Sequence, residues 1–318
     1  MTKNLPLLSI VIANYNYGRF LEDAIKSVIS QGVGDQFELI ICDGGSTDNS
    51  VEIIKKYAHG LPPNMSRAEW HPAPQRPTTN NPCITPSDKR QTTNDYNLIS
   101  WWCSEKDKGQ SDAFNKGFSH AKGKFGCWLN ADDIMMPGAL PAVINYINCH
   151  SQCEWLAGSS VFVNNELKIK WCSRCVHAWR NGFRRFPMYS VNGPSSFFLV
   201  ANLIKAGGFD ESLRYTMDTD LWRRFAKAGI ALHHIPNYVW CFRVHEESKT
   251  SHKFITGKGS DSFASEGLSM NLRYGITPFR NKIGSSLNRL LRLATGAYLR
   301  SYIDTCRYKG KSIDVIGK

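Results

Sequence analysis

Carboxylate side chains follow three separate apolar segments of this 318-residue chain, each at the point where a segment ends. The aspartates are Asp43, Asp107, Asp132 and Asp133, and the apolar segments before them are residues 37–42, 101–102 and 125–129. Each aspartate by itself is also a favoured cap for the first turn of a helix. Several carboxylates held close together repel one another unless a metal ion, a polar ligand or hydrogen bonds offset the cost.

Oxygen ligands of this kind suit Mg²⁺ or Mn²⁺, which keeps several waters and joins one or two carboxylates to the phosphates of a substrate. The two best-known glycine-rich phosphate loops, GxGxxG and GxxxxGKS or GxxxxGKT, do not occur in the sequence. We therefore expect a divalent metal, rather than a glycine loop, to neutralise a nucleoside diphosphate at this site.

The segments that carry the aspartates alternate with amphipathic segments, as strands and helices do around a parallel sheet. Residues 7–13 are apolar without alternation, which is typical of a strand buried on both faces, and residues 20–29 have helical spacing. Further along the chain we expect helices at 51–57, at 113–121, from after Pro137 to about 148, and at 219–228. We expect strands at 100–104, 155–163, 167–171, 230–235 and 238–243, and residues 197–204 form a further apolar run. Ligands bind at the carboxyl ends of such strands, so we expect the aspartates to meet there.

Between residues 59 and 97 the alternation is lost, and seven of the fourteen prolines fall in this stretch. This composition predicts an irregular insertion at residues 60–97. With 42% hydrophobic and 21% charged residues, the chain is neither disordered nor collagen-like. No apolar run reaches the ~18 residues of a membrane span, and the N-terminus has no signal cleavage site, so we expect a cytoplasmic protein.

Four ordered blocks resemble the family 2 glycosyltransferases of the GT-A fold. The blocks are residues 9–16 (SIVIANYN), 43–48 (DGGSTD), 104–117 (SEKDKG to NKG) and 129–133 (LNADD), and the resemblance continues at 193–198, 207–210, 217–222 and 243–245. It covers roughly residues 5–250. It implies a Rossmann-like, mostly parallel α/β sheet in a single catalytic domain at 1–250. A nucleotide-sugar half is expected at 1–133 and an acceptor half at 134–250.

By this resemblance, the nucleotide site is formed by Asn14, Asn16, Asp43, Ser46, Asp107, Asn115, Lys116 and Asp132. Asp43 is expected on the base of the nucleotide. Asp132 matches the last acid of the family's DxD metal motif, whereas the first acid of that motif is Asn130 here. Asp132 and Asp133 are therefore expected to bind the metal. His245 matches a C-terminal histidine of the family that reaches the metal or the diphosphate and is expected as a third ligand, although a histidine at a strand end is also compatible with a structural role.

Asp218 is the residue that we expect to act as the catalytic base, with Asp220 as the alternative. Direct displacement at the anomeric carbon needs a carboxylate that takes the proton of the acceptor hydroxyl. Asp218 stands just before the expected helix 219–228, where the helix dipole favours its ionised form. The same position is typical of a plain helix cap. The family often has glutamate before this aspartate, where this chain has Met217.

The formal net charge of +12 is concentrated at the C-terminus, because residues 271–318 contain ten basic and only two acidic residues. Residues 286–303 have apolar side chains at helical spacing with Arg289, Arg292 and Arg300 between them. A basic amphipathic helix is typical of a segment that binds an anionic membrane surface. A helix that packs on the catalytic body is equally compatible. Because the basic charge is concentrated here and the family resemblance ends near residue 250, we treat residues 251–318 as a basic, helical tail that is separate from the domain before it.

These features together predict an inverting, metal-dependent glycosyltransferase of the hexosyltransferase type. The resemblance implies a UDP-sugar donor and a saccharide or lipid-linked acceptor in envelope polysaccharide synthesis. The basic pattern of the tail suggests that it lies at the inner face of the cell membrane. One alternative is a binding-only or nucleotidyltransferase member of a related fold. Another is a nucleic-acid-binding protein that uses the basic tail, although no recognised nucleic-acid motif accompanies it.

The ten cysteines are too sparse for a disulfide scaffold, so we expect reduced thiols. Cys149 with Cys153, and Cys172 with Cys175, have a spacing that is compatible with a zinc site. Such spacing also arises by chance in a reduced chain.

Overall fold

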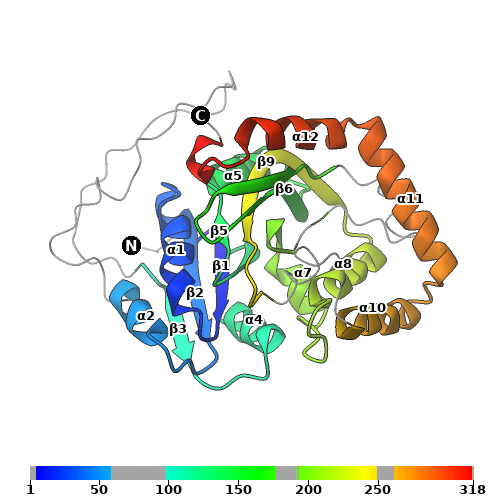
Figure 1. Ribbon diagram of the computed structural model, residues 1–318. Helices are drawn as coiled ribbons and strands as arrows, with labels where there is room; N and C mark the ends of the chain where they lie inside the picture. The colour runs from blue at the N-terminus through cyan, green and yellow to red at the C-terminus, as the bar shows by residue number, and fades with distance from the viewer. Residues whose placement is uncertain (1–4, 59–97, 177–190, 192, 249–260, 317–318) are drawn as a thin grey trace.

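The structure, a computed structural model, describes residues 5–58, 98–176, 191, 193–248 and 261–316. Nine strands in the described parts form one sheet in the order β3-β2-β1-β4-β8-β6-β9-β5, with β7 paired to β6 (Figure 1). The strands are β1 Leu8–Asn14, β2 Phe37–Asp43, β3 Trp101–Ser104, β4 Phe125–Asn130, β5 Ile134–Met135, β6 Trp155–Val163, β7 Ile169–Ser173, β8 Ser196–Leu199 and β9 Leu232–Arg243. The expected insertion at 60–97 lies outside the described residues.

Strands β3, β2, β1 and β4 are parallel, as the alternating pattern predicts. Their register places Asn14 beside Asp43, and Asp43 beside Ser104, at the carboxyl ends of neighbouring strands. Strand β8 then joins β4 in the antiparallel sense and continues the sheet into β6 and β9, which are parallel to each other. The polar residues that follow β1, β2 and β4 therefore converge on one edge.

Helices cover both faces of the sheet. They are α1 Gly18–Ile29, α2 Ser50–Ala58, α4 Gln110–Ser119, α5 Ala139–Cys149, α7 Val200–Lys205, α8 Met217–Ala228, α10 Asp261–Arg273, α11 Pro278–Ala294 and α12 Ala297–Tyr308, with short 3-10 turns η1 Gly34–Gln36, η2 Gly193–Ser195 and η3 Ile313–Val315. Alternate side chains of β1 enter different cores: Leu8, Ile10 and Ile12 pack with α1, α2 and α5, whereas Val11 packs with α4, α7 and α8. The strand is thus buried on both faces.

Helix α4 approaches the sheet closely because it has a glycine at the crossing point. A Cβ at Gly117 would lie 2.3 Å from Cγ1 of Val11 and 3.1 Å from Sγ of Cys42. No larger residue fits there without displacing the helix. This glycine belongs to the Asn115-Lys116-Gly117 block, so part of that block serves helix–sheet packing.

Three predicted elements differ from those observed. The run at 197–204 contains both β8 and α7, and the two strands expected at 230–243 form the single strand β9. Pro236 lies within β9 beside a shift in the register with β6, where a missing N–H is tolerated. The helix expected at 286–303 is divided between α11 and α12, because Gly296 adopts a left-handed conformation with φ of +67°.

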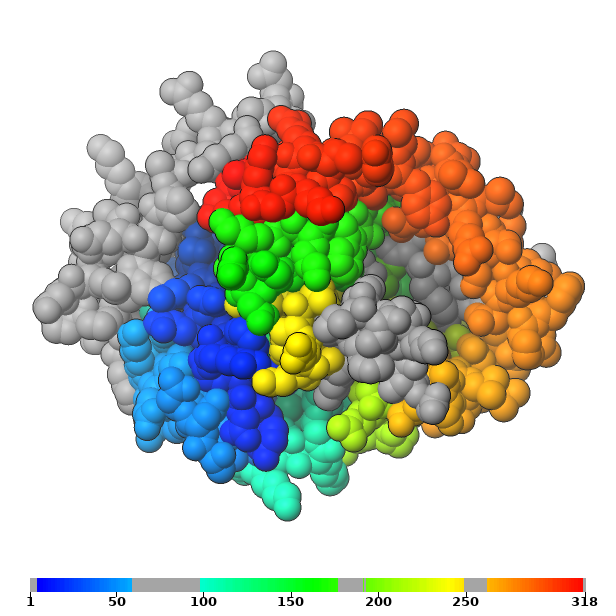
Figure 2. All heavy atoms as spheres, in the orientation of Figure 1, coloured from blue at the N-terminus to red at the C-terminus, as the bar shows by residue number. Residues whose placement is uncertain are grey.

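The three C-terminal helices follow one another in an arc along the outer edge of the molecule (Figures 1 and 2). Helix α12 packs on β7, where Thr305 accepts a hydrogen bond from the N–H of Cys172 (2.9 Å) and Asp304 pairs with Arg174. In α11 only Gly284 is buried. None of the helices in the described parts of the chain has the length and hydropathy that a membrane span requires.

Candidate active site

A cavity of about 690 Å³ opens where the carboxyl ends of β1 and β4 face the first turn of α8. It is lined by five residues that the sequence singles out, namely Asn14, Asn16, Asp107, Asp132 and Asp218. The structure therefore brings together residues that are more than 200 positions apart in the chain. The other predicted site residues do not line it.

Asp132 and His245 meet at the end of β4. Their side chains lie 2.9 Å apart, between Oδ2 and Nε2, and both residues are almost completely buried. Arg243, at the end of β9, holds this loop, because its Nε donates to the carbonyl oxygen of Asp132 (3.0 Å) while its terminal nitrogen pairs with Asp23 (3.0 Å). The pairing of two chain segments 113 residues apart thus depends on a buried arginine.

Asp133 is turned away from the cavity and is completely buried. Its Oδ1 accepts a hydrogen bond from the N–H of Arg243 (3.1 Å), and its Oδ2 accepts one from Nδ2 of Asn130 (2.8 Å). Burial, followed by the nearby charge of Asp132, raises the pKa of Asp133. The expected role of Asp133 as a metal ligand does not agree with this placement. The amide of Asn130, in place of the motif's first acid, is what allows it to donate to Asp133.

The donors that remain suit a divalent cation that is held mainly by its substrate. Asp132 supplies a carboxylate, and His245 supplies an imidazole whose Nδ1 has no hydrogen-bond partner among the described residues. Within those residues no group of three or more His, Cys, Asp or Glu side chains gathers to hold a metal. Mg²⁺ and Mn²⁺ are commonly bound through one or two protein ligands and the phosphates of a substrate, so these residues fit such an ion.

Asp43 lies behind the cavity wall, where protein donors already surround its carboxylate. Oδ1 accepts hydrogen bonds from Nδ2 of Asn14 (2.6 Å) and from the hydroxyl of Ser46 (2.5 Å). Oδ2 accepts from the N–H of Ser46 (2.9 Å) and the hydroxyl of Ser104 (2.6 Å). Asn16 accepts from the N–H of Thr47 (2.8 Å), so the same network orders the edge of the cavity.

Asp107, Asn115 and Lys116 were expected in one nucleotide site, but only Asp107 lines the cavity. Burial raises the pKa of Asp107. Both polar atoms of the Asn115 side chain bond the backbone of Phe209, at 2.9 and 2.7 Å, which ties α4 to the loop before α8. Lys116 pairs with Glu105 at 2.8 Å.

Asp218 occupies the second position of α8, which begins at Met217 and not after Asp218 as expected. Its Oδ1 accepts hydrogen bonds from the N–H (2.6 Å) and the hydroxyl (3.2 Å) of Thr219, and no hydrogen bond from a described residue reaches Oδ2. A Cβ at Gly193 would lie 3.3 Å from Oδ2, so this glycine keeps the space before the oxygen open. Burial raises the pKa of Asp218.

Asp220 points away from the cavity. Its carboxylate pairs with Arg224 (2.8 Å) and accepts a hydrogen bond from the hydroxyl of Tyr274 (2.6 Å). It is 2% exposed and does not line the cavity, which argues against its expected role as an alternative base.

Several lining residues were not predicted from the sequence. They are mainly aromatic or charged side chains from the second half of the chain, including Phe162, Arg214, Tyr215, Trp240, Phe242 and Glu247. Phe263 belongs to α10 and so comes from the segment expected to be a separate tail. No local sequence signal distinguishes these residues from core or surface positions. The four cysteines considered for zinc form no metal cluster within the described residues.

A family model described as "Glycosyl transferase family 2" matches residues 9–67 and 92–194, about half of the chain. An uncharacterized glycosyltransferase of Nostoc sp. is 31% identical over 137 residues, which are 43% of this chain and 31% of that protein. Chondroitin synthase of Escherichia coli is 23% identical over 294 residues, which are 90% of this chain and 36% of that protein. The chain therefore spans about a third of the length of these two relatives.

Two solved structures share the fold. TarS 1-349 of S. aureus, in complex with UDP-GlcNAc, has a TM-score of 0.53 and 13% identity, with 83% of this chain and 65% of that chain covered. The mannosyltransferase PcManGT from Pyrobaculum calidifontis, in complex with GDP-Man and Mn²⁺, has a TM-score of 0.51 and 16% identity, with 93% and 81% covered. At these identities the likeness establishes the architecture alone, and the GT-A fold predicted from the sequence is confirmed.

Proposed function

This chain belongs to glycosyl transferase family 2, and we propose that it transfers a sugar from a nucleotide-diphosphate sugar, with UDP as the preferred nucleotide, to a hydroxyl of a saccharide or lipid-linked acceptor. The observation that carries this proposal is the shared cavity, which contains Asp132 from the end of β4 and Asp218 from the start of α8. The first suits the diphosphate side of the reaction, and the second suits the acceptor side.

Asp218 acts as the base in this proposal. Its Oδ2 takes the proton of the acceptor hydroxyl. At the same time the hydroxyl oxygen of the acceptor forms a bond to the anomeric carbon, and the bond between that carbon and the diphosphate breaks. A single displacement of this kind inverts the configuration at the anomeric carbon. The role is supported by the hydrogen bonds from Thr219, which occupy Oδ1 and orient the carboxylate. Burial makes the carboxylate a stronger base than a solvated aspartate.

Asp132 and His245 hold a Mg²⁺ or Mn²⁺ ion together with the donor phosphates. When bound, the ion neutralises the charge that develops on the leaving diphosphate. Asn14, Asn16 and Asp107 contact the nucleotide from the cavity wall. Asp43 and Ser46 reach the base only after exchanging some of their present hydrogen bonds, so we assign them to the support of the pocket first.

The acceptor is expected at an anionic membrane surface, where lipid-linked saccharides are found. This part of the proposal is supported by α11, which exposes apolar side chains beside arginines. The envelope polysaccharide role is likewise a proposal; the minor teichoic acid biosynthesis protein GgaB of Bacillus subtilis matches 67% of this chain at 25% identity.

A donor screen tests the proposal directly. The full chain is incubated with a panel of nucleotide sugars and Mn²⁺ or Mg²⁺, and the products are identified. Release of nucleoside diphosphate is expected, most rapidly from a UDP-sugar, whereas release of a sugar 1-phosphate would indicate nucleotidyl transfer. Binding without turnover of any donor or acceptor would indicate a binding-only protein.

The same assay tests the base. Asp218→Asn is expected to lower kcat by about 10²- to 10⁴-fold, the contribution typical of general base catalysis, with donor affinity unchanged. Asp35→Asn, an exposed aspartate outside the cavity, is the matched control and is expected to be as active as the wild type. Near-normal activity of Asp218→Asn would show that another group takes the proton.

A further inference from the structure

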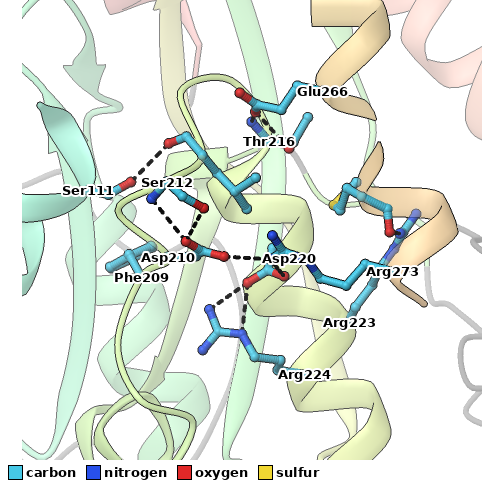
Figure 3. A network of polar contacts seen from close by, with 12 residues as sticks. Ser111, Phe209, Asp210, Ser212, Thr216, Asp220, Arg223, Arg224, Glu266 and Arg273 are labelled. Carbon is cyan, nitrogen blue, oxygen red and sulfur yellow. Dashed lines mark hydrogen bonds and ion pairs between the residues drawn. The ribbon is translucent and has the colours of Figure 1, made fainter. Parts of the chain in front are cut away.

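Glu266 lies on α10, outside the segment expected to form the catalytic domain, yet its carboxylate bonds the backbone of the loop before α8 (Figure 3). Its Oε2 accepts a hydrogen bond from the N–H of Arg214 (2.8 Å). Its Oε1 accepts three, from the N–H of Tyr215 (2.8 Å) and from the N–H (2.7 Å) and hydroxyl (2.8 Å) of Thr216. One side chain thus fixes three consecutive residues.

This loop leads directly to the proposed base. Thr216 is the residue before the first turn of α8, and its hydroxyl bonds Glu266 and does not cap the helix. Arg214, Tyr215 and Asp218 all line the cavity, so the segment held by Glu266 is continuous with the acceptor side of the site. The ring of Phe263, one turn before Glu266 on the same helix, meets the ring of Tyr215 edge to face at 5.9 Å.

The carboxylate is suited to hold this loop permanently. Burial alone would raise the pKa of Glu266, but the donors from Arg214, Tyr215 and Thr216 outweigh it and lower the pKa. The group therefore stays ionised, and charge-assisted hydrogen bonds are stronger than neutral ones.

Side-chain contacts join helix α10 to α8 and to the loop before α8. Met270 is 4% exposed, and its carbonyl oxygen accepts a hydrogen bond from Arg223 (3.3 Å). Arg223 also bonds Oδ1 of Asn271 (2.6 Å), and Arg273 pairs with Asp210 (Figure 3). These contacts lie along the part of the helix that follows Glu266.

We propose that Glu266 is a positioning residue for sugar transfer, which sets the place of the Asp218 carboxylate through the backbone of residues 214–216. The inference rests on the proposed function, since it needs Asp218 as the base. Glu266 itself is absent from the cavity lining and does not touch the reacting atoms. Removing it releases the segment that begins α8 and moves Asp218 relative to the acceptor hydroxyl.

Kinetics of Glu266→Ala and Glu266→Gln test the proposal, with Glu22→Gln as the matched control. Glu22 is a carboxylate on α1 that bonds Lys56 and Tyr57, away from the cavity. Misplacement of a catalytic group by about 1 Å costs about 100-fold, so Glu266→Ala is expected to lower kcat by about 10- to 100-fold. The KM for the donor stays within about twofold, because the proposed donor residues lie at or after the ends of β1, β3, β4 and β9 and not in the loop that Glu266 holds. Glu266→Gln keeps one acceptor oxygen, and its kcat is expected to be intermediate.

A second readout separates positioning from loss of stability. Release of the loop admits water to Asp218, so its raised pKa falls and the acid limb of kcat/KM moves to lower pH in Glu266→Ala but not in Glu22→Gln. Amide hydrogen exchange at residues 214–216 is expected to accelerate in the same variant only. If wild-type protein transfers sugar and Glu266→Ala keeps its kcat and pH profile, the inference is wrong while the proposed function stands. Wild-type protein that turns over no donor overturns both.

Discussion

Among the described residues, the Asp218 side chain accepts hydrogen bonds from one neighbour, Thr219, and burial raises its pKa. Three buried aspartates near it, Asp43, Asp133 and Asp220, are satisfied by protein donors, and the fourth, Asp132, is paired with His245. Asp43 has four hydrogen bonds, Asp133 is bonded by Arg243 and Asn130, and Asp220 is bonded by Arg224 and Tyr274. A carboxylate saturated by donors is a poor proton acceptor, and Asp132 is engaged with His245, so this difference favours Asp218 as the base.

The pH dependence of both rate and stability follows from the raised pKa of Asp218. The base must be ionised, so kcat/KM is expected to fall as the pH drops through this pKa. The folded protein holds the proton more tightly than the unfolded chain, so this residue's contribution to the free energy of unfolding decreases as the pH rises through the folded pKa. Asp218→Asn removes that decrease.

Thermal unfolding at several pH values checks this prediction. Asp218→Asn is expected to have a higher Tm than the wild type near pH 7. At about pH 3, below the pKa of about 3.9 that aspartate has in an unfolded chain, the two proteins are expected to have the same Tm. Asp35→Asn, at an exposed position, serves as the control and is expected to show no such difference. A lower Tm of Asp218→Asn near pH 7 would contradict the raised pKa.

The sequence predicts which residues gather at the site better than it predicts their contacts. Asn14, Asp132 and Asp218 stand in local motifs, and all three line the cavity. The partners of Asp43 and Asp133 depend on strand register, since Ser104 lies opposite Asp43 and Arg243 reaches Asp133 from 110 positions away. A short motif contains no information on such distant donors, so the ligand role expected for Asp133 was not excluded.

Elements follow from local patterns where one physical cause dominates. The apolar run of β1 is buried on both faces, and its length and type were predicted correctly. The prediction of one continuous helix at 286–303 was wrong. The apolar spacing continues through Gly296, but the backbone turns at this residue and α12 begins after it. The apolar spacing indicates which side chains of a helix face the rest of the protein, but it does not indicate where a glycine allows the helix to end.

Alanine at three glycines tests these backbone arguments. Gly117→Ala is expected to lower the free energy of unfolding by about 1–3 kcal/mol, because its Cβ overlaps Val11. Gly296→Ala has open space but a φ of +67°, so about 1 kcal/mol is expected to be lost. Gly267 lies within α10 in open space, so Gly267→Ala is expected to raise stability by about 0.5–1 kcal/mol. Urea unfolding gives the three values, and a stabilising Gly117→Ala would contradict the close approach of α4.

For the whole molecule, the C-terminal segment has two different surfaces. Its inner side is connected to the proposed active site, through Glu266 at the loop before α8 and Tyr274 at Asp220. These contacts join residues on both sides of the domain boundary that was expected at residue 250. The boundary itself stays a prediction. The outer side of α11 exposes Phe279, Leu290 and Leu293, whose spacing places them on one face of the helix.

That outer face predicts binding to anionic membranes. Lys282 and Arg289 lie beside the apolar stripe, so lipid headgroups and acyl chains would meet complementary groups. Leu290 and Leu293 are 61% and 63% exposed, so replacing them with serine leaves the core intact. Full burial of a leucine side chain contributes about 1.5–3 kcal/mol, and a tenfold change in affinity corresponds to about 1.4 kcal/mol. The double variant is therefore expected to bind phosphatidylglycerol vesicles at least about tenfold more weakly, even if each leucine is only partly buried in the membrane.

Sedimentation with vesicles measures this binding, and Ile204→Ser provides the control. Ile204 is an equally exposed apolar residue, 67% exposed, but it lies on α7 without the basic stripe. The wild type is expected to sediment with phosphatidylglycerol and not with phosphatidylcholine vesicles, and Arg289→Gln to cost about 1 kcal/mol at low salt. Equal sedimentation of the wild type and the double variant would show that α11 does not face the membrane. Loss of binding in Ile204→Ser would place the contact on another surface.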